Sequence, residues 1–190
     1  MRTNLAPLPT RTTPATGPEP PVADVAVPPF ALASLLESRA DFDRVFRVVR
    51  GAVRRALGIE RTGLGLGLSD LPPSLGAYWQ VTGNIIVMNE GLVHAMEANA
   101  SSVLEFNSFV YVILAHEYLH ALGYLDEAEV RRVTAYVTRT VFGGSHPATH
   151  MAEGDLWRMY PFLAYAPRGQ GRRLRLVRGF DRASTDTYIR

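Results

Sequence analysis

Two residue types are missing from this sequence, and each absence narrows the chemistry that the protein can use. The chain of 190 residues has no cysteine, which excludes disulfides and metal sites built from thiolates. Lysine is absent too, because every basic residue is an arginine, and the formal net charge is only +2. The domain as a whole is therefore not strongly basic, and any metal ion must be held by His, Asp or Glu side chains.

Long apolar runs are also absent. The longest one near the motif described below, residues 109–115, is far shorter than the roughly 20 residues that a membrane-spanning helix needs. The N-terminus lacks the continuous apolar segment of a secretory signal. With 47% hydrophobic residues, the chain can still build one ordinary core. We expect a soluble, cytoplasmic protein without a membrane anchor.

The chain divides into a proline-rich arm and a single domain. Residues 1–29 contain eight prolines and few residues that could form a core, so we expect this arm to be disordered or extended. Residues 30–190 form the domain. The arm is a conceivable inhibitory segment, although no residue pattern requires that role.

Hydrophobic periodicity predicts an α+β fold, in which a small sheet packs on a central helix. Helical spacing of apolar residues occurs in five segments, namely residues 31–57, 92–98, 102–122, 127–142 and about 153–160. Strand-like patterns occur in four shorter segments, namely residues 62–68, 78–81, 85–88 and 174–177. The second and third strands are separated by a turn-forming Thr-Gly-Asn, which predicts a hairpin. The helix at residues 102–122 begins with a capping-box pattern and is apolar nearly all round, which indicates burial.

The central helix carries the sequence His116-Glu117-Tyr118-Leu119-His120. Histidines four residues apart lie on one face of a helix and can bind the same zinc ion. Glu117 lies beside them and can reach water bound to that zinc ion, whose pKa the metal lowers toward ~7. The motif predicts a hydrolase in which Glu117 is the catalytic base and in which His116 and His120 bind one zinc ion per chain.

The segment that follows extends this pattern into a resemblance. Residues 116–126 resemble the motif of the zincin metallopeptidases, and more narrowly the metzincin form H-E-x-x-H-x-x-G-x-x-H/D. The resemblance implies that Gly123 turns the chain and that Asp126 is the third zinc ligand. It also implies a peptide substrate, bound along the edge strand of an antiparallel sheet. We expect that edge strand to be the run that begins at Ile85 and ends at Met88.

Other residues compete with Asp126 for the third ligand position. Asp126 begins a capping-box pattern for the next helix, so its presence needs no metal. The competing side chains are Glu127, Glu129, His146 and His150. A glutamate on the following helix would match the gluzincins, another zincin group.

Several other residues are candidates for supporting roles. The methionine-containing turn of metzincins has two candidates here, Met151 and Met159, and neither stands out. Tyr124 and Tyr160 are candidates for stabilising an oxyanion, although such tyrosines are more often simply packed. His94 is expected to be a surface residue.

Two other functional classes compete with a peptidase. A metal-dependent endoribonuclease resembling the bacterial rRNA-maturation family has H-x-x-x-H-x-x-x-x-x-H, with a Gly-Tyr pair after the second His. That reading fits Gly123, Tyr124 and the C-terminal arginine cluster, which offers a nucleic-acid surface. It does not fit Glu117 or Asp126. A non-catalytic zincin-like binding protein is the third class, and the intact Glu117 argues against it. The arginine cluster consists of Arg168, Arg172, Arg173, Arg175 and Arg178.

Overall fold

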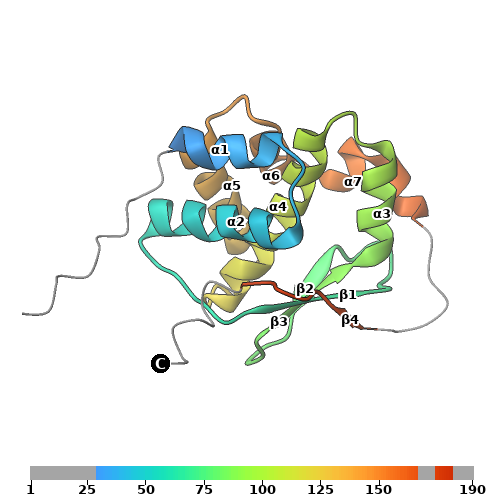
Figure 1. Cartoon of the computed structure of the whole chain (residues 1–190), viewed down its shortest axis with the longest axis horizontal. Helices are drawn as coiled ribbons and strands as arrows, with labels where there is room; N and C mark the ends of the chain where they lie inside the picture. The colour runs from blue at the N-terminus through green and yellow to red at the C-terminus, as the bar shows by residue number, and fades with distance from the viewer. Residues whose placement is uncertain (1–28, 167–173, 182–190) are drawn as a thin grey trace, which may run out of the picture.

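The part of the chain that the structure describes, residues 29–166 and 174–181 of a computed structural model, contains seven α-helices, one 3-10 helix and a mixed four-stranded sheet. The expected α+β class is confirmed. The helices gather on one side of the sheet (Figure 1). No described helix is long and apolar enough to cross a membrane. The arm expected at residues 1–29 lies outside the described residues except for Pro29, and so do Arg168, Arg172 and Arg173.

The N-terminal helical segment is two helices, α1 (Pro29–Glu37) and α2 (Phe42–Leu57), where one helix over residues 31–57 was predicted. That prediction was wrong because Asp41 begins a new helix. Its backbone is extended, and its carboxylate accepts a hydrogen bond of 2.8 Å from the N–H of Arg44. The apolar spacing continues across the break, so periodicity alone does not reveal it. Gly58 ends α2 in the left-handed conformation, which glycine adopts without strain.

The central helix α4 (Val103–Ala121) forms the middle of the core. Ser102 caps it by accepting a hydrogen bond from the N–H of Glu105 at 3.1 Å. The Glu105 carboxylate in turn accepts a hydrogen bond from the N–H of Ser101. In a standard capping box the donor is the N–H of the cap residue itself, which here is Ser102. The prediction of a buried helix is confirmed, because nearly every residue from Asn107 to Leu119 is buried. The remaining helices are α3 (Glu90–Asn99), α5 (Glu127–Phe142), α6 (Pro147–Glu153), α7 (Leu156–Met159) and the 3-10 helix η1 (Pro161–Tyr165).

The sheet corrects one prediction about the site. Its strands are β1 (Gly65–Ser69), β2 (Ala77–Trp79), β3 (Ile85–Asn89) and β4 (Arg175–Leu176), in the spatial order β2-β3-β1-β4. The predicted hairpin is confirmed as the antiparallel pair β2–β3. The strand from Ile85 to Met88 is not an edge strand, because β3 also pairs in parallel with β1. The edge strand of the hairpin is β2.

The alternating glycines and leucines of β1 place different groups on its two faces. Leu66 and Leu68 are buried in the core. Gly67 lies on the other face, where a Cβ atom would collide with the side chain of Leu174. Glycine at this position therefore allows the C-terminal segment to approach β1 closely.

Candidate metal centre

The last turns of α4 bring the two histidines of the motif together. The Nε2 atoms of His116 and His120 are 3.2 Å apart. Their side chains are largely covered, with 22% and 13% of their area exposed. Burial lowers the pKa of His116, which favours the neutral ring that metal binding requires.

Glu127 joins the two histidines from the first turn of α5. One carboxylate oxygen lies 3.1 Å from Nε2 of His120, and the other lies 3.3 Å from Nε2 of His116. The three side chains form a group that could hold a metal ion. With 66% of its side chain exposed, Glu127 leaves this group accessible from solvent.

The structure does not bring Asp126, the predicted third ligand, into this group. Its carboxylate caps α5 by accepting a hydrogen bond of 2.7 Å from the N–H of Glu129. The carboxylate of Asp126 therefore acts as a helix cap, as its capping-box pattern indicates. Of the alternatives considered from the sequence, only Glu127 lies with the histidines.

The hydrogen bonding of His120 places two acceptor atoms against each other. Its Nδ1 lies 2.8 Å from the backbone carbonyl oxygen of Tyr124. A carbonyl can only accept, so Nδ1 carries a proton, and in a neutral ring Nε2 then presents a lone pair. That lone pair faces a carboxylate oxygen of Glu127, which is also an acceptor. Two acceptors at this distance need a proton or a metal ion between them, and a metal ion would contact His116 as well.

Glu117 lies beside the group in an apolar environment. It is buried, and burial raises the pKa of Glu117 to about 7. The backbone N–H of Trp79, in the edge strand β2, donates a hydrogen bond to its carboxylate. Glu117 is thus held by the strand that lies over the end of α4, a contact that no sequence pattern indicates.

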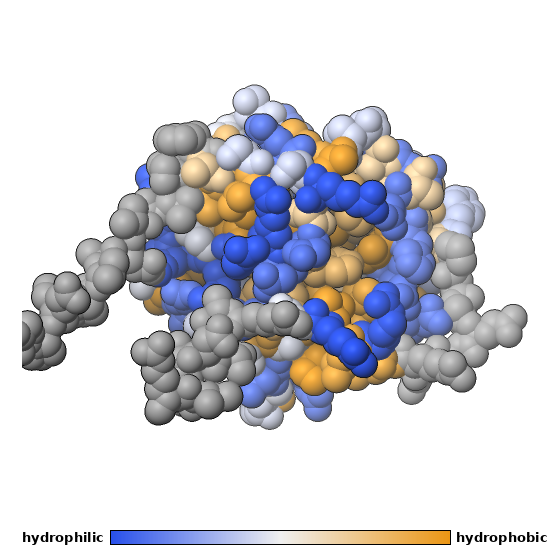
Figure 2. Space-filling view, viewed as in Figure 1, coloured by the Kyte–Doolittle hydropathy of each residue, from blue (hydrophilic) through white to orange (hydrophobic). Residues whose placement is uncertain are grey.

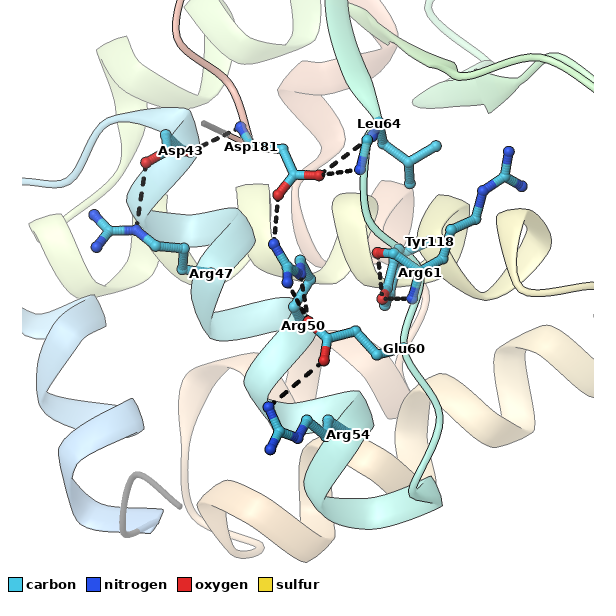
Figure 3. Close-up of polar contacts among 10 residues, drawn as sticks. Asp43, Arg47, Arg50, Arg54, Glu60, Arg61, Leu64, Tyr118 and Asp181 are labelled. Atoms are coloured by element: carbon cyan, nitrogen blue, oxygen red, sulfur yellow. Dashed lines mark hydrogen bonds and ion pairs between the residues drawn. The ribbon is translucent and has the colours of Figure 1, made fainter. Parts of the chain in front are cut away.

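Tyr118, the residue after Glu117, connects the motif to the segment before β1. Its ring is fully buried and packs edge-on against Phe46, with 5.3 Å between ring centroids. Its hydroxyl accepts a hydrogen bond from the N–H of Arg61 at 2.6 Å and donates one to the carbonyl of Arg61 at 2.9 Å (Figure 3). Neither residue was singled out from the sequence, because the contact joins segments far apart in the chain.

The other histidines considered for the site lie elsewhere. His94 is exposed on α3, as expected. His146 caps α6, where its Nδ1 accepts a hydrogen bond from Ala148, and its ring stacks on Phe142. His150 is exposed on α6.

The tyrosines and methionines that were candidates for supporting roles make other contacts or lie elsewhere. The Tyr160 hydroxyl donates a hydrogen bond to Glu105 at the opposite end of α4. Tyr124 contributes its backbone carbonyl to His120. Met151 and Met159 both lie in helices and not in a turn.

A groove elsewhere on the molecule does not contain the histidine group. It has a volume of about 790 Å³ and is lined by the first turns of α4, by α3 and by the α1–α2 connection. Figure 2 shows apolar side chains reaching the surface among hydrophilic ones on this face of the molecule. The candidate metal centre lies at the other end of α4.

Comparison with known proteins does not assign this site. No protein-family model matches the chain, and no curated protein or solved structure shows significant similarity to it. The interpretation therefore depends on the geometry of the residues themselves.

Proposed function

We propose that this protein is a zinc-dependent hydrolase that cleaves peptide bonds, with His116, His120 and Glu127 as the zinc ligands and Glu117 as the general base. One observation carries the proposal. Three side chains that can bind a metal ion converge on one point, and a buried carboxylate with a raised pKa, Glu117, lies on the same helix as two of them. Two histidines and a glutamate are a donor set of catalytic zinc sites, in which a fourth position stays open.

The spacing of the donor atoms supports zinc in particular. Tetrahedral zinc with bonds of about 2.0–2.1 Å places neighbouring ligand atoms roughly 3.3 Å apart. The Nε2 atoms of the two histidines are 3.2 Å apart. One carboxylate oxygen of Glu127 lies 3.1 Å from Nε2 of His120 and the other lies 3.3 Å from Nε2 of His116, so each contact is close to the spacing that zinc requires. The carbonyl of Tyr124 fixes the orientation of His120 in the way that outer contacts of metal ligands commonly do.

A bound zinc ion and Glu117 would have different roles in the reaction. A zinc ion at this position would act as a Lewis acid that polarises the scissile carbonyl and acidifies water. Glu117 takes a proton from the attacking water as the oxygen of that water bonds to the carbonyl carbon. When the C–N bond breaks, Glu117 gives the proton to the leaving amine. A carboxyl group whose pKa is near neutrality is suited to both transfers.

The substrate class follows from the strand beside the site. Strand β2 pairs with β3 on one side only, and its residue Trp79 contacts Glu117. An extended peptide that added to this edge would run past the histidine group. The peptide-binding strand expected at residues 85–88 is therefore proposed to be β2 instead. The exposure of Glu127 favours a substrate that lies on the surface over a small molecule in a deep cavity.

The ligand set also refines the resemblance to zincins. Asp126 as third ligand would match metzincins, whereas Glu127 on the following helix matches the gluzincin arrangement. We therefore propose a zincin-like peptidase of the second kind. The ribonuclease alternative would need a third histidine at position 126, where this chain has a capping aspartate.

Elemental analysis combined with a peptidase assay tests this function. Purified protein is expected to hold about one zinc per chain, and His116→Ala and His120→Ala are expected to lose it. On a quenched fluorescent peptide library, Glu117→Gln should keep its zinc but lower turnover by roughly 10²–10⁴-fold, the usual contribution of general acid–base catalysis. Wild-type turnover in Glu117→Gln would exclude the mechanism. Zinc-free wild-type protein purified without chelator would exclude the metal site.

A further inference from the structure

We infer that Arg61 is a positioning residue of this site, which holds the edge strand β2 against α4 and thereby holds the Trp79 N–H on Glu117. The consequence for catalysis rests on the proposed function. The structural part of the inference does not, because it concerns contacts that exist whether or not a peptide is cleaved.

The guanidinium of Arg61 joins the last turn of α4 to the turn between β2 and β3. One nitrogen donates to the carbonyl oxygen of Ala121 at 2.7 Å, which is in the last turn of α4. The other donates to the carbonyl of Gly83 at 3.1 Å and to the side-chain oxygen of Asn84 at 2.8 Å, both in the β2–β3 turn. The carbonyls in the last turn of a helix lack helical partners, and a cation there is favourable.

The same guanidinium also contacts the residue that reaches Glu117. Its carbon lies 5.5 Å from the centre of the Trp79 ring, within cation–π range. The indole N–H of Trp79 donates to the carbonyl of Gly83 at 3.0 Å, so Gly83 accepts from both Arg61 and Trp79. The Arg61 guanidinium thus contacts the face of the indole ring, and the hydrogen bond to Gly83 holds its N–H edge. The backbone N–H of Trp79, which bonds to Glu117, is fixed with it.

Arg61 can hold the strand because its own backbone is fixed to the motif helix. Tyr118 makes hydrogen bonds to both its N–H and its carbonyl. A few residues later, the N–H groups of Gly63 and Leu64 donate to the buried carboxylate of Asp181, which Arg50 also contacts (Figure 3). These hydrogen bonds hold the segment before β1 in place. The guanidinium of Arg61 in turn holds the β2–β3 hairpin against this segment.

Only arginine provides these contacts together. Its planar fork reaches acceptors in two directions and stacks on an aromatic face, whereas lysine carries a single point charge. We therefore expect Arg61→Lys to keep part of the function and Arg61→Gln to lose it. The matched control is Arg47→Gln, on the exposed side of α2, where Arg47 pairs with Asp43.

Amide hydrogen exchange, followed residue by residue by NMR, tests the inference without requiring activity. In Arg61→Gln we expect the amides of Trp79 and the β2–β3 turn to exchange roughly 10-fold faster or more, as loss of a charge-assisted hydrogen bond implies. The core amide of Leu114 should change much less. The Arg61→Lys variant should fall in between, and Arg47→Gln should match wild type.

Tryptophan fluorescence gives a second measure, because the chain has only two tryptophans. In a Trp157→Phe background Trp79 is the sole emitter, and Arg61→Gln should shift its emission to the red and make it easier to quench. Zinc content should stay at wild-type level while turnover of peptide falls by roughly 10-fold or more, through loss of orientation.

The possible results separate the two claims. Wild-type exchange and emission in Arg61→Gln would overturn the inference, and so would an equal acceleration at Leu114, because that indicates general destabilisation. If Arg61→Gln does not fold, Arg61→Lys decides by the same comparison. A loosened hairpin with unchanged turnover would remove the positioning role. A wild-type protein that binds no zinc or cleaves no peptide would contradict the proposed function instead, and the exchange data would still decide whether Arg61 holds β2.

Discussion

The carboxylates of Asp126 and Glu127 are expected to respond differently to substitution, although the two residues are consecutive in the sequence. Asp126 accepts a hydrogen bond from the N–H of Glu129 and begins α5. Glu127 faces His116 and His120 and is largely exposed. We predict that Asp126 contributes to stability and Glu127 to metal affinity.

The magnitudes follow from these two environments. Removing the cap in Asp126→Ala should cost about 1 kcal/mol. That corresponds to a melting temperature lower by about 2–4 °C in a domain of this size. Asp126→Asn should be nearly silent, because asparagine caps a helix as well as aspartate does. Glu127→Gln should leave the metal-free melting temperature almost unchanged. Its zinc affinity should fall by about 100-fold or more, because changes to outer contacts alone cost about 10–100-fold.

Thermal melts with and without zinc measure both effects at once. Zinc at 100 times the wild-type dissociation constant should stabilise the wild type and Asp126→Ala by up to about 2.7 kcal/mol each, the value reached when the unfolded chain binds no zinc. For Glu127→Gln with 100-fold weaker binding, the same concentration should give only about 0.4 kcal/mol. Loss of the zinc effect in Asp126→Asn, together with its retention in Glu127→Gln, would refute this assignment. It would restore Asp126 as the third ligand.

Two further predictions concern the polar contacts that support the fold. Asp181→Ala should destabilise the protein by about 3–5 kcal/mol, as expected when one partner of a buried ion pair is removed, and urea unfolding would measure the loss. Hydrogen bonds from Ser101 lower the pKa of Glu105 below its ordinary value. The contribution of Glu105 to the free energy of unfolding is therefore present above the ordinary pKa and is lost as the pH falls through the lowered pKa of the folded protein. Urea unfolding at pH 7 and pH 3 should therefore show a larger acid loss in wild type than in Glu105→Gln; equal losses would contradict the argument.

The helices nearest the site were predictable from the sequence because their signals are local. The apolar run of α4, its capping serine and the valine stripe of α5 depend only on neighbouring residues, and both helices form where expected. The break before α2 was missed because a cap at Asp41 interrupts the helix without interrupting its apolar spacing. Helix α6 was missed because it has seven residues and its first turn begins at a proline within an expected loop.

The parts of the site that were not predicted depend on contacts between distant segments. Sequence spacing placed His116, Glu117 and His120 together, since all three lie on one helix. It could not distinguish Asp126 from Glu127, because the turn after α4 decides which carboxylate faces the histidines. It also could not show that β3 pairs with β1, because that parallel pairing joins segments on either side of β2. Arg61 and Trp79 were missed for the same reason.

All three proposed ligands lie between residues 116 and 127, and this closeness affects how the protein acquires its metal. Closing such a short loop costs little conformational entropy, so the two helix ends and their turn can meet before the sheet is assembled. An unfolded or newly synthesised chain would then already have measurable affinity for zinc. Binding to the unfolded state reduces the stabilisation that a ligand gives to the native state. Zinc would consequently stabilise this fold by less than its affinity for the native protein implies, and metal loading could begin while the chain is still being made.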